Sequence, residues 1–294
     1  MMAKSINLYL LDGKADGRIK CTLANWTGLA YKIPRTDLDP CKDRSDLKQS
    51  GVYFLFGTSD QSGDRKVYIG QAANRKNGEG ILNRLLEHRR NPEKDYWNEA
   101  VILTTSNDSF GATEISYLEN RSCRLASEAG RYIVKNGNEP TPGHITEEKE
   151  CELEEFINNA RIVMGTLGHP VFEPILIKPT VSESDPDNGC AMMPFYLKTT
   201  KASATGRHTR EGFVVLKGSQ LSAQPTQSCP VSIRRLREKQ AERIDQQGIL
   251  MDDVLLSSPS AAASFVTYAS ANGVVMWITE DGRSFKETEN CNLQ

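Results

Sequence analysis

The stretch Gly51-Val52-Tyr53-Phe54-Leu55-Phe56, followed by Val67-Tyr68-Ile69-Gly70, decides the fold of this 294-residue chain. Both segments are rich in aromatic and β-branched residues, which favour β-strands. The residues between them are rich in turn formers. The sequence therefore predicts two paired strands, over residues 51–56 and 66–70.

Working outward, the periodicity predicts the elements that pack on these strands. We expect a helix over 79–90, a strand over 97–105, a helix over 112–130, and a helix with an acidic face over 147–165. Pro92 ends the first of these helices and Gly130 caps the second. This order of elements predicts an α+β fold, a small sheet packed by helices.

The flanking residues predict further elements and the domain boundaries. We expect strands near 5–11, 18–23 and 171–177. The predicted organisation is a β appendage over 1–45, a main domain over 46–178, a linker over 179–192 and a second, small α+β domain over 193–290. The linker is proposed because residues 179–188 are polar and contain prolines.

Charge is unevenly distributed, although the net charge is only -2. Residues 65–94 carry eight Lys or Arg against three Glu, whereas residues 147–155 carry six Glu against one Lys. A basic surface near the predicted strand pair suits phosphate binding. The distribution, and not the total, therefore points to a nucleic-acid partner.

The cysteines and the hydropathy predict the compartment. All seven cysteines occur singly and no C-x-x-C pair is present, which favours reduced thiols over disulfides or a zinc site. The N-terminal residues lack the apolar core of a signal peptide, and no apolar run is long enough to span a membrane. We expect a cytoplasmic protein with no membrane partner.

Gly-Val-Tyr on one strand and Tyr-Ile-Gly on the next resemble the GIY-YIG nuclease family, which cleaves phosphodiesters with one metal ion. The resemblance covers about residues 50–145, and the predicted order of elements is that of the family. It implies two phenols side by side on a hairpin, with Tyr53 taking the proton of the attacking water and Tyr68 shaping the site. The alternative is an aromatic pair that serves packing alone.

Arg84 and His88 are four residues apart, so a helix places them on one face. The family has an Arg on this helix, often with a His one turn later. Arg84 would bind phosphate oxygens, and His88 would bond a phenol or the phosphate, or move a proton. A solvated helix face is the alternative, since Arg89 and Arg90 follow directly.

Glu119 borders the apolar stripe of its predicted helix, where a carboxylate needs a partner such as a hard divalent ion. The resemblance makes Glu119 the ligand of one Mg²⁺ or Mn²⁺, with Glu114 as the competing candidate. The family also has an orienting Asn after this helix. We assign it to Asn138, although Asn136 fits the same turn.

Three further positions are predicted to contact the substrate. Lys66 matches a Lys often found in the family directly before the second motif strand. Gly70 of the motif and Arg89 of the helix complete the predicted substrate contacts.

The second domain has features of its own. Ser258 and Pro259 predict a helix start, and Asn272-Gly273 predicts a turn into a strand that ends at Trp277. This pattern resembles the DUF4357 domain and the RAMA-type domains of restriction–modification proteins, for which modified-DNA binding has been suggested. Those domains tend to have Trp after Asn-Gly, where this chain has Val274.

Together these patterns predict a metal-dependent DNA endonuclease with a C-terminal DNA-recognition domain. Residues 196–250 contribute ten Lys or Arg against four acidic residues, which favours nucleic acid as the partner. The rival interpretation is a non-catalytic DNA-binding or adaptor protein that keeps the nuclease fold as a scaffold, with restriction or repair proteins as partners. The substrate type and the oligomeric state are left open.

Overall fold

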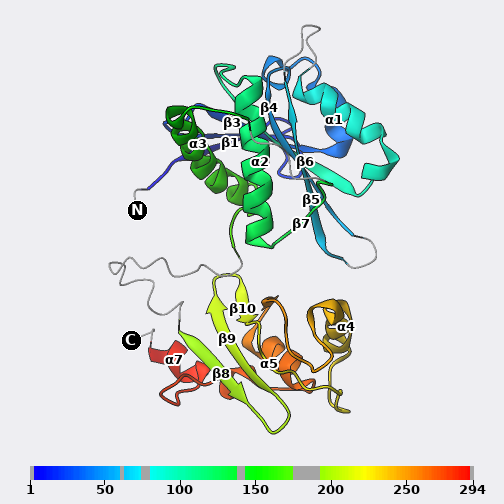
Figure 1. The fold of residues 1–294 in the computed structure, drawn as a ribbon, viewed down its shortest axis with the longest axis vertical. Coiled ribbons are helices and arrows are strands. Elements are labelled where there is room, and N and C mark those ends of the chain that lie inside the picture. Colours follow the sequence, from blue (N-terminus) through cyan, green and yellow to red (C-terminus); the bar gives the residue numbers. More distant parts are fainter. Residues whose placement is uncertain (1–2, 60–62, 74–79, 138–142, 175–192, 292–294) are drawn as a thin grey trace. The chain divides into compact units, whose positions relative to one another are not determined.

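The computed structural model describes residues 3–59, 63–73, 80–137, 143–174 and 193–291. The chain divides into two compact units, Met1–Pro174 and Ile175–Gln294 (Figure 1). The predicted linker 179–192 and the predicted site residue Asn138 lie outside the described residues. No helix of the described ranges is long and apolar enough to cross a membrane.

The first unit is built on a seven-stranded sheet in the order β1-β2-β3-β6-β4-β5-β7. All neighbouring strands are antiparallel except β5 and β7, which are parallel. The strands are β1 Ile6–Leu10, β2 Ile19–Leu23, β3 Gly28–Pro34, β4 Gly51–Thr58, β5 Arg65–Ala72, β6 Trp97–Thr105 and β7 Ile133–Val134. The helices are α1 Ile81–Arg90, α2 Ala112–Ala129 and α3 Glu147–Thr166.

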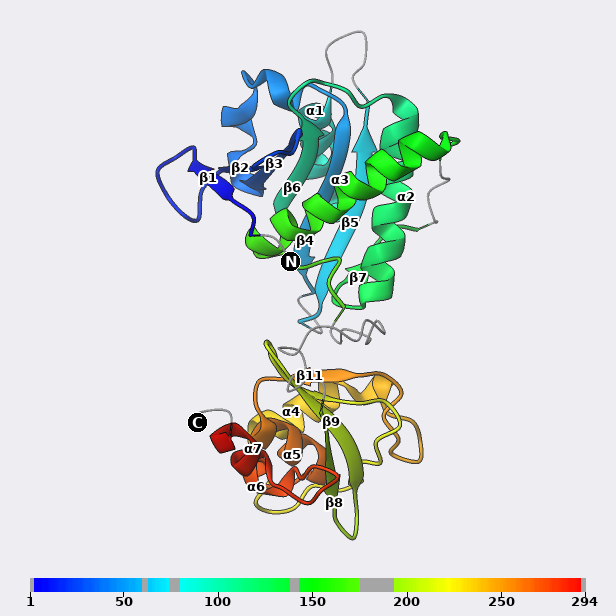
Figure 2. The same cartoon turned by 90° about the vertical axis from the view of Figure 1, so that its left-hand side faces the viewer.

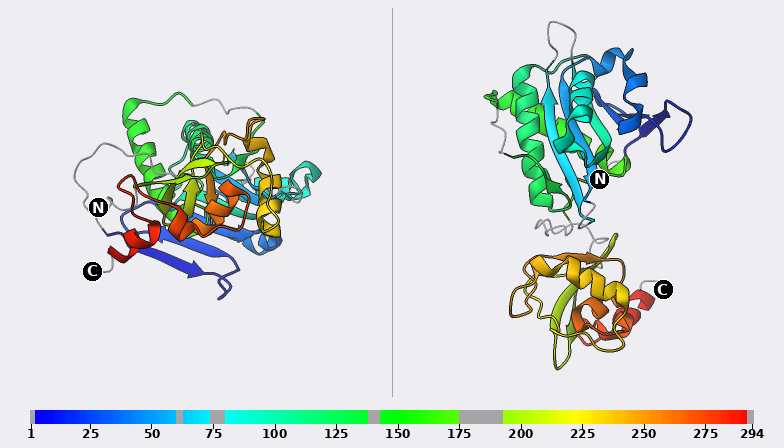
Figure 3. Two further views of the ribbon diagram at one scale, coloured as in Figure 1. Left: turned by 90° about the horizontal axis from the view of Figure 1, so that it is seen from below. Right: turned by 90° about the vertical axis from the view of Figure 1, so that its right-hand side faces the viewer.

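Helices cover both faces of this sheet. Helices α2 and α3 lie on one face (Figure 2), and α1 lies on the other (right view of Figure 3). Because side chains alternate along a strand, Val52 and Phe54 of β4 pack towards α2 and α3, whereas Tyr53 and Leu55 pack towards α1. The central strand is therefore buried on both faces.

The predicted strand pair, the strand over 97–105 and the three helices of this unit are confirmed, and the fold is α+β. The N-terminal strands, in contrast, do not form a sheet of their own. Strand β3, which the sequence patterns did not reveal, pairs with β6 and joins β1 and β2 to the central sheet. It escaped prediction because it is buried on both faces and so shows no alternation.

No strand forms over residues 171–174 of the first unit, where the sequence predicted the start of one. Pro170 and Pro174 flank this segment and remove backbone donors that a strand would need. Val171 and Phe172 pack into the core from a turn instead.

The second unit is a four-stranded antiparallel sheet in the order β11-β10-β9-β8, packed by helices. Its strands are β8 Pro194–Lys198, β9 Ser203–Thr209, β10 Gly212–Val215 and β11 Val254–Leu256. Its helices are α4 Val231–Lys239, α5 Pro259–Thr267, α6 Gly273–Met276 and α7 Phe285–Cys291. The prediction of a second, small α+β domain is confirmed.

The start of α5 is as predicted, since the Ser258 hydroxyl accepts a hydrogen bond from the Ala261 amide at 3.1 Å. Two other predictions for this unit are wrong. The sequence predicts a basic helix near Ser232–Gln247, but helix α4 ends at Lys239. Asn272-Gly273 leads into the one-turn helix α6 and not into a strand, because Gly273 packs directly on the Pro259 carbonyl and leaves no room for a strand partner.

The close packing of Tyr53 on Gly70 yields a stability prediction. A β-carbon at Gly70 would overlap the phenol ring of Tyr53. We expect Gly70→Ala to lower the free energy of unfolding by about 1–3 kcal/mol, the usual cost of overpacking a core. Urea denaturation measures this change.

Gly165→Ala is the matched control, because Gly165 lies in α3 and a methyl group added there would meet open space. It should stabilise the protein slightly, by up to about 1 kcal/mol, through the higher helix propensity of alanine. If Gly70→Ala were as stable as the wild type, the position of the Tyr53 ring would not depend on a glycine at residue 70.

Candidate active site

The hairpin places the two motif tyrosines diagonally on one face of the sheet. Tyr53 stands opposite Gly70, and Tyr68 stands opposite Leu55. The two ring centroids are 6.3 Å apart. Because Gly70 has no side chain, the Tyr53 ring lies directly over the β5 backbone. The side-by-side arrangement of the phenols is thus a property of the strand register.

Helix α1 brings His88 to this pair. Ile81, Leu82 and Leu85 are buried against the sheet, so the next turn of the helix turns His88 inward. The Tyr53 hydroxyl and His88 Nε2 are 2.6 Å apart, and the His88 ring centroid is 5.3 Å from that of Tyr68. The sequence-predicted contact between this imidazole and a phenol is therefore present.

Burial fixes the protonation of this pair. Burial lowers the pKa of His88 to about 4, and the positive charges of Lys94 and Arg84 act in the same direction. Burial also raises the pKa of Tyr53 far above its usual value. At neutral pH a neutral imidazole thus faces a protonated phenol, and the tautomer of His88 decides which of the two groups donates the hydrogen bond.

The two phenols differ in their access to solvent. Tyr53 is only 1% exposed, whereas Tyr68 is partly exposed. Burial raises the pKa of Tyr68 as well, and the carboxylate of Glu119 raises it further. The phenol that bonds His88 is thus closed off from solvent, and its neighbour lines the open side.

Arg84 lies one turn before His88 with its side chain 43% exposed. Its guanidinium forms an ion pair with Glu87 at 2.5 Å, which raises the pKa of Arg84. The same positive charge lowers the pKa of Tyr53 and so opposes the effect of burial. Arg84 is therefore near enough to Tyr53 to stabilise negative charge on the phenol.

Glu119 reaches the same site from α2. Burial raises the pKa of this carboxyl, while hydrogen bonds from the side chain and backbone of Gln71 lower it. Gln71 is itself held by Ser116, with its Nε2 3.0 Å from the serine hydroxyl. Gln71 thus orients the Glu119 carboxylate, a role that no sequence pattern had suggested.

The remaining predicted residues have varied surroundings. Asn136 holds strand β5: its Oδ1 accepts from the Ile69 amide at 3.1 Å, and its Nδ2 donates to the Ile69 carbonyl at 2.8 Å. Arg89 is paired with Asp39 at 2.7 Å. Lys66 lies on the same face of β5 as Tyr68, with its Nζ 5.8 Å from the Tyr96 ring centroid.

Lys94 is a further site residue that no sequence pattern had selected. It follows α1 in a short turn, and its Nζ is 3.2 Å from the centroid of the Tyr68 ring. Only the folded chain reveals this contact, because Lys94 belongs to no spacing pattern with the tyrosines.

The donor set fits a divalent ion only in part. Within the described residues, no three His, Cys, Asp or Glu side chains come together as a metal site. Mg²⁺ is, however, often bound by one or two carboxylates together with waters and substrate phosphates. Glu119, whose charge is destabilised by burial, fits an Mg²⁺ or Mn²⁺ site that substrate phosphate oxygens complete.

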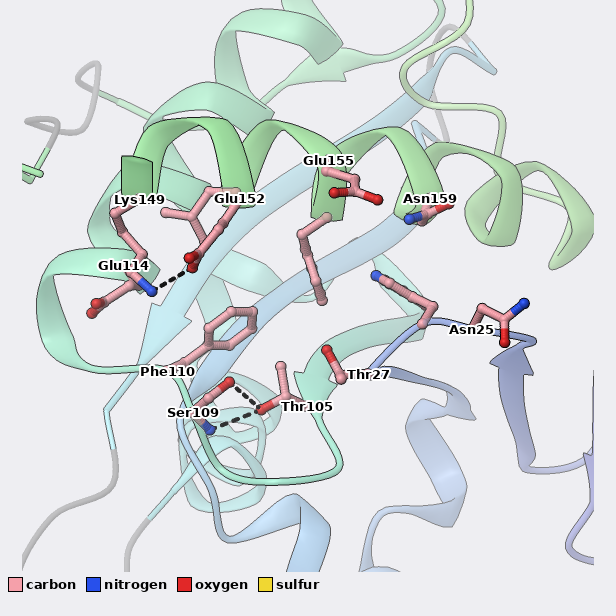
Figure 4. A pocket seen from close by; sticks show the side chains of 13 residues that line it. Asn25, Thr27, Thr105, Ser109, Phe110, Glu114, Lys149, Glu152, Glu155 and Asn159 are labelled. Atoms are coloured by element: carbon pink, nitrogen blue, oxygen red, sulfur yellow. Dashed lines mark hydrogen bonds and ion pairs between the residues drawn. The ribbon is translucent and has the colours of Figure 1, made fainter. Parts of the chain in front are cut away.

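A cavity of about 240 Å³ lies elsewhere in the first unit, beside α3 and the start of α2 (Figure 4). Glu114, Glu152 and Glu155 are among its lining residues, and Lys149 there is paired with Glu152 at 2.5 Å. Such an acidic lining is unsuited to phosphate. Glu114, the competing metal candidate, therefore belongs to a different part of the surface from Glu119.

Residues 195–289 match the family described as "Domain of unknown function (DUF4357)". The C-terminal unit contains a DUF4357 domain. The predicted resemblance of the second domain to DUF4357 is confirmed. The resemblance of residues 50–145 to GIY-YIG nucleases stays a prediction. No curated protein and no solved structure matches the chain.

In the DUF4357 domain, Trp277 belongs to the core. It is fully buried, its ring centroid is 4.6 Å from that of Phe213, and its Nε1 donates to the Pro259 carbonyl at 3.0 Å. This indole therefore cannot stack on a nucleobase. Any recognition of nucleic acid by the domain must use other side chains.

The buried imidazole gives a pH prediction. The folded-state pKa of His88, about 4, lies below its usual value of 6.5. The unfolded chain therefore binds the proton more readily, and His88 makes the protein less stable as the pH falls from 6.5 to 4. The full effect is about 3 kcal/mol.

NMR titration of the imidazole tests this directly, with the exposed His144 as a reference in the same spectra. A His88 midpoint near 6.5 would contradict the buried, neutral state of the ring.

Proposed function

We propose that this protein is a metal-dependent endonuclease that hydrolyses DNA phosphodiesters at the Tyr53–Tyr68 site. The observation that carries the proposal is the 2.6 Å contact between Tyr53 and His88, with Arg84 and Glu119 close enough to act on the two phenols electrostatically. An acid–base pair, a cation and a carboxylate at one site are the groups that phosphodiester hydrolysis needs.

In the proposed reaction, Tyr53 and His88 move the proton of the attacking water. The raised pKa of Tyr53 makes the free phenol a poor base. Proton transfer from Tyr53 to His88 is unfavourable in the free protein, because burial raises the pKa of the phenol and lowers that of the imidazole. A bound phosphate would raise the pKa of His88 and a divalent ion would lower that of Tyr53, so that His88 would accept the phenolic proton as the phenol oxygen receives the proton of water. His88 is therefore the final acceptor, and Tyr53 is the relay and the group that positions the water.

Arg84 would bind the scissile phosphate through its guanidinium fork and offset the charge that builds up during attack. This requires Arg84 to exchange its exposed ion pair with Glu87 for a phosphate, and an exposed pair of this kind is weak. Glu119 would hold the divalent ion, which when bound supplies Lewis-acid activation of the phosphate. Gln71 keeps the Glu119 carboxylate oriented for that purpose.

For the DUF4357 domain we propose a DNA-recognition role that rests on its basic residues. Helix α4 carries Arg234, Arg235, Arg237 and Lys239. Arg237 is buried, and its guanidinium lies 4.6 Å from the Tyr268 ring centroid, so it supports the fold. Arg235 and Lys239 are exposed and available to phosphate.

A second candidate is a non-catalytic DNA-binding or adaptor protein that works with restriction or repair proteins. The observation that favours it is the burial of Tyr53, which is 1% exposed in the free protein. If substrate binding does not open a path to this phenol, the fold serves only as a scaffold.

The two candidates predict opposite results for site variants. Under the endonuclease proposal, Tyr53→Phe, Arg84→Ala and Glu119→Gln each abolish cleavage of plasmid DNA and leave the fold intact. Removing one group that stabilises transition-state charge costs roughly 10²–10³-fold in rate. The measurement is a nicking assay, with circular dichroism as the check on folding.

Glu114→Gln is the matched control, since it makes the same chemical change on the same helix beside the separate cavity. It should cleave at nearly the wild-type rate. Full activity of Glu119→Gln would remove Glu119 from the metal site, and inactivity of the wild-type protein on all DNA substrates would favour the adaptor interpretation.

The metal is tested separately. Cleavage should need Mg²⁺ or Mn²⁺ and stop in EDTA, because the proposed mechanism relies on the metal at Glu119 to activate the phosphate. Calorimetry should find weak Mg²⁺ binding without DNA, since substrate oxygens complete the site. Undiminished cleavage in chelator would exclude the one-metal mechanism.

A further inference from the structure

The short turn after α1 directs Lys94 back over the site. Pro92–Lys94 form a single 3-10 turn, and the Asn91 side chain fixes its start by accepting from the Glu93 amide at 3.0 Å. The Lys94 ammonium then lies 3.2 Å from the Tyr68 ring centroid. The turn thus holds a positive charge against the partly exposed phenol of the motif.

Lys94 has no carboxylate partner, unlike three of the cations around it. Arg84 pairs with Glu87, Arg89 with Asp39 and Arg35 with Asp95. Lys94 forms no ion pair with any residue in the part of the chain that the structure describes. A partly buried ammonium without a counter-ion is unfavourable, and the aromatic ring compensates only in part.

The charges around Lys94 favour the binding of an anion next to its ammonium group. Burial, together with the positive charge of Arg84, lowers the pKa of Lys94 to about 8. The nearby carboxylate of Glu119 acts in the opposite direction but is held by Gln71. An anion bound between the two cations would remove the repulsion between them.

We infer that Lys94 is a phosphate-binding residue of the Tyr53–Tyr68 site and contacts the DNA backbone beside the phosphate that Arg84 binds. This inference rests on the proposed function, whose substrate it defines more closely as a polyanion held by two cations. An ammonium suits this task because it contacts phosphate as a compact point charge, without the fixed geometry of a guanidinium.

The rival explanation is structural, with Lys94 serving only as a cover on the Tyr68 ring. The two roles differ in their dependence on salt. A phosphate contact releases counter-ions when it forms. The loss of one such contact therefore makes the negative slope of log K against log salt concentration less steep by about 0.9 for duplex DNA. A cover on a ring changes stability but leaves this slope unchanged.

The test uses the full chain and a short fluorescent DNA duplex in EDTA, so that binding is measured without cleavage. Affinity is determined over a series of salt concentrations for the wild type, Lys94→Met, Lys94→Arg and Lys14→Met. We expect Lys94→Met to bind the duplex several-fold more weakly, with a slope that is less steep by about 0.9. Lys94→Arg should keep the wild-type slope. Lys14→Met removes the same charge from an exposed turn and should match the wild type.

An unchanged slope in Lys94→Met, or an equal loss in Lys14→Met, would overturn the inference. Failure of the wild-type protein to bind the duplex at low salt would also overturn the inference. A parallel nicking assay with Mg²⁺ keeps the two proposals apart. Binding that depends on Lys94 without any cleavage would refute the endonuclease proposal and retain the phosphate contact. Cleavage with an unchanged slope in Lys94→Met would refute the phosphate contact and retain the endonuclease proposal.

Discussion

The hydrogen bond between Tyr53 and His88 joins the three elements on which the candidate site depends. Strand β4 supplies the phenol, β5 supplies the bare backbone of Gly70 beneath it, and α1 supplies the imidazole. Both polar groups are buried, so loss of their contact would leave two unsatisfied groups at about 1–3 kcal/mol each. The bond therefore constrains the position of the helix as well as the chemistry of the site.

The same burial that makes this bond necessary determines the charges around it. A neutral His88, a destabilised Glu119 carboxylate and a Lys94 ammonium without a carboxylate partner surround the two phenols. Burial makes the charged forms of Glu119 and Lys94 less favourable than they would be in water. A bound phosphate would stabilise the Lys94 ammonium, and a divalent ion bound with it would stabilise the Glu119 carboxylate.

Outside the site, several charged groups of the described residues have partners within the chain. The acidic residues of α3 are either exposed or paired, as Glu154 is with Arg121 at 2.6 Å. In the DUF4357 domain the buried Arg237 is enclosed by the rings of Phe265 and Tyr268. Trp277 likewise is committed to packing. These features stabilise the two units and leave recognition to exposed side chains.

The sequence by itself determined the elements whose patterns are local. The two motif strands, α1, α2 and the capped start of α5 follow from strand composition, helical spacing and turn chemistry, all of which act within a few residues. The resemblance carried by the motif also selected Tyr53, Tyr68, Arg84, His88 and Glu119. The strand register and α1 place the two tyrosines and His88 together, and Arg84 is near enough to lower the pKa of Tyr53.

Tertiary structure alone decided what depends on distant partners. Strand β3 has no alternation because both of its faces are buried, so only its pairing with β6 reveals it. Gly273 begins a helix because the Pro259 carbonyl lies against it. Gln71 and Lys94 enter the site through contacts with α2 and with the Tyr68 ring, and the sequence contains no spacing that records them. Burial sets the protonation of His88, and burial is a property of the packed chain, not of the residue.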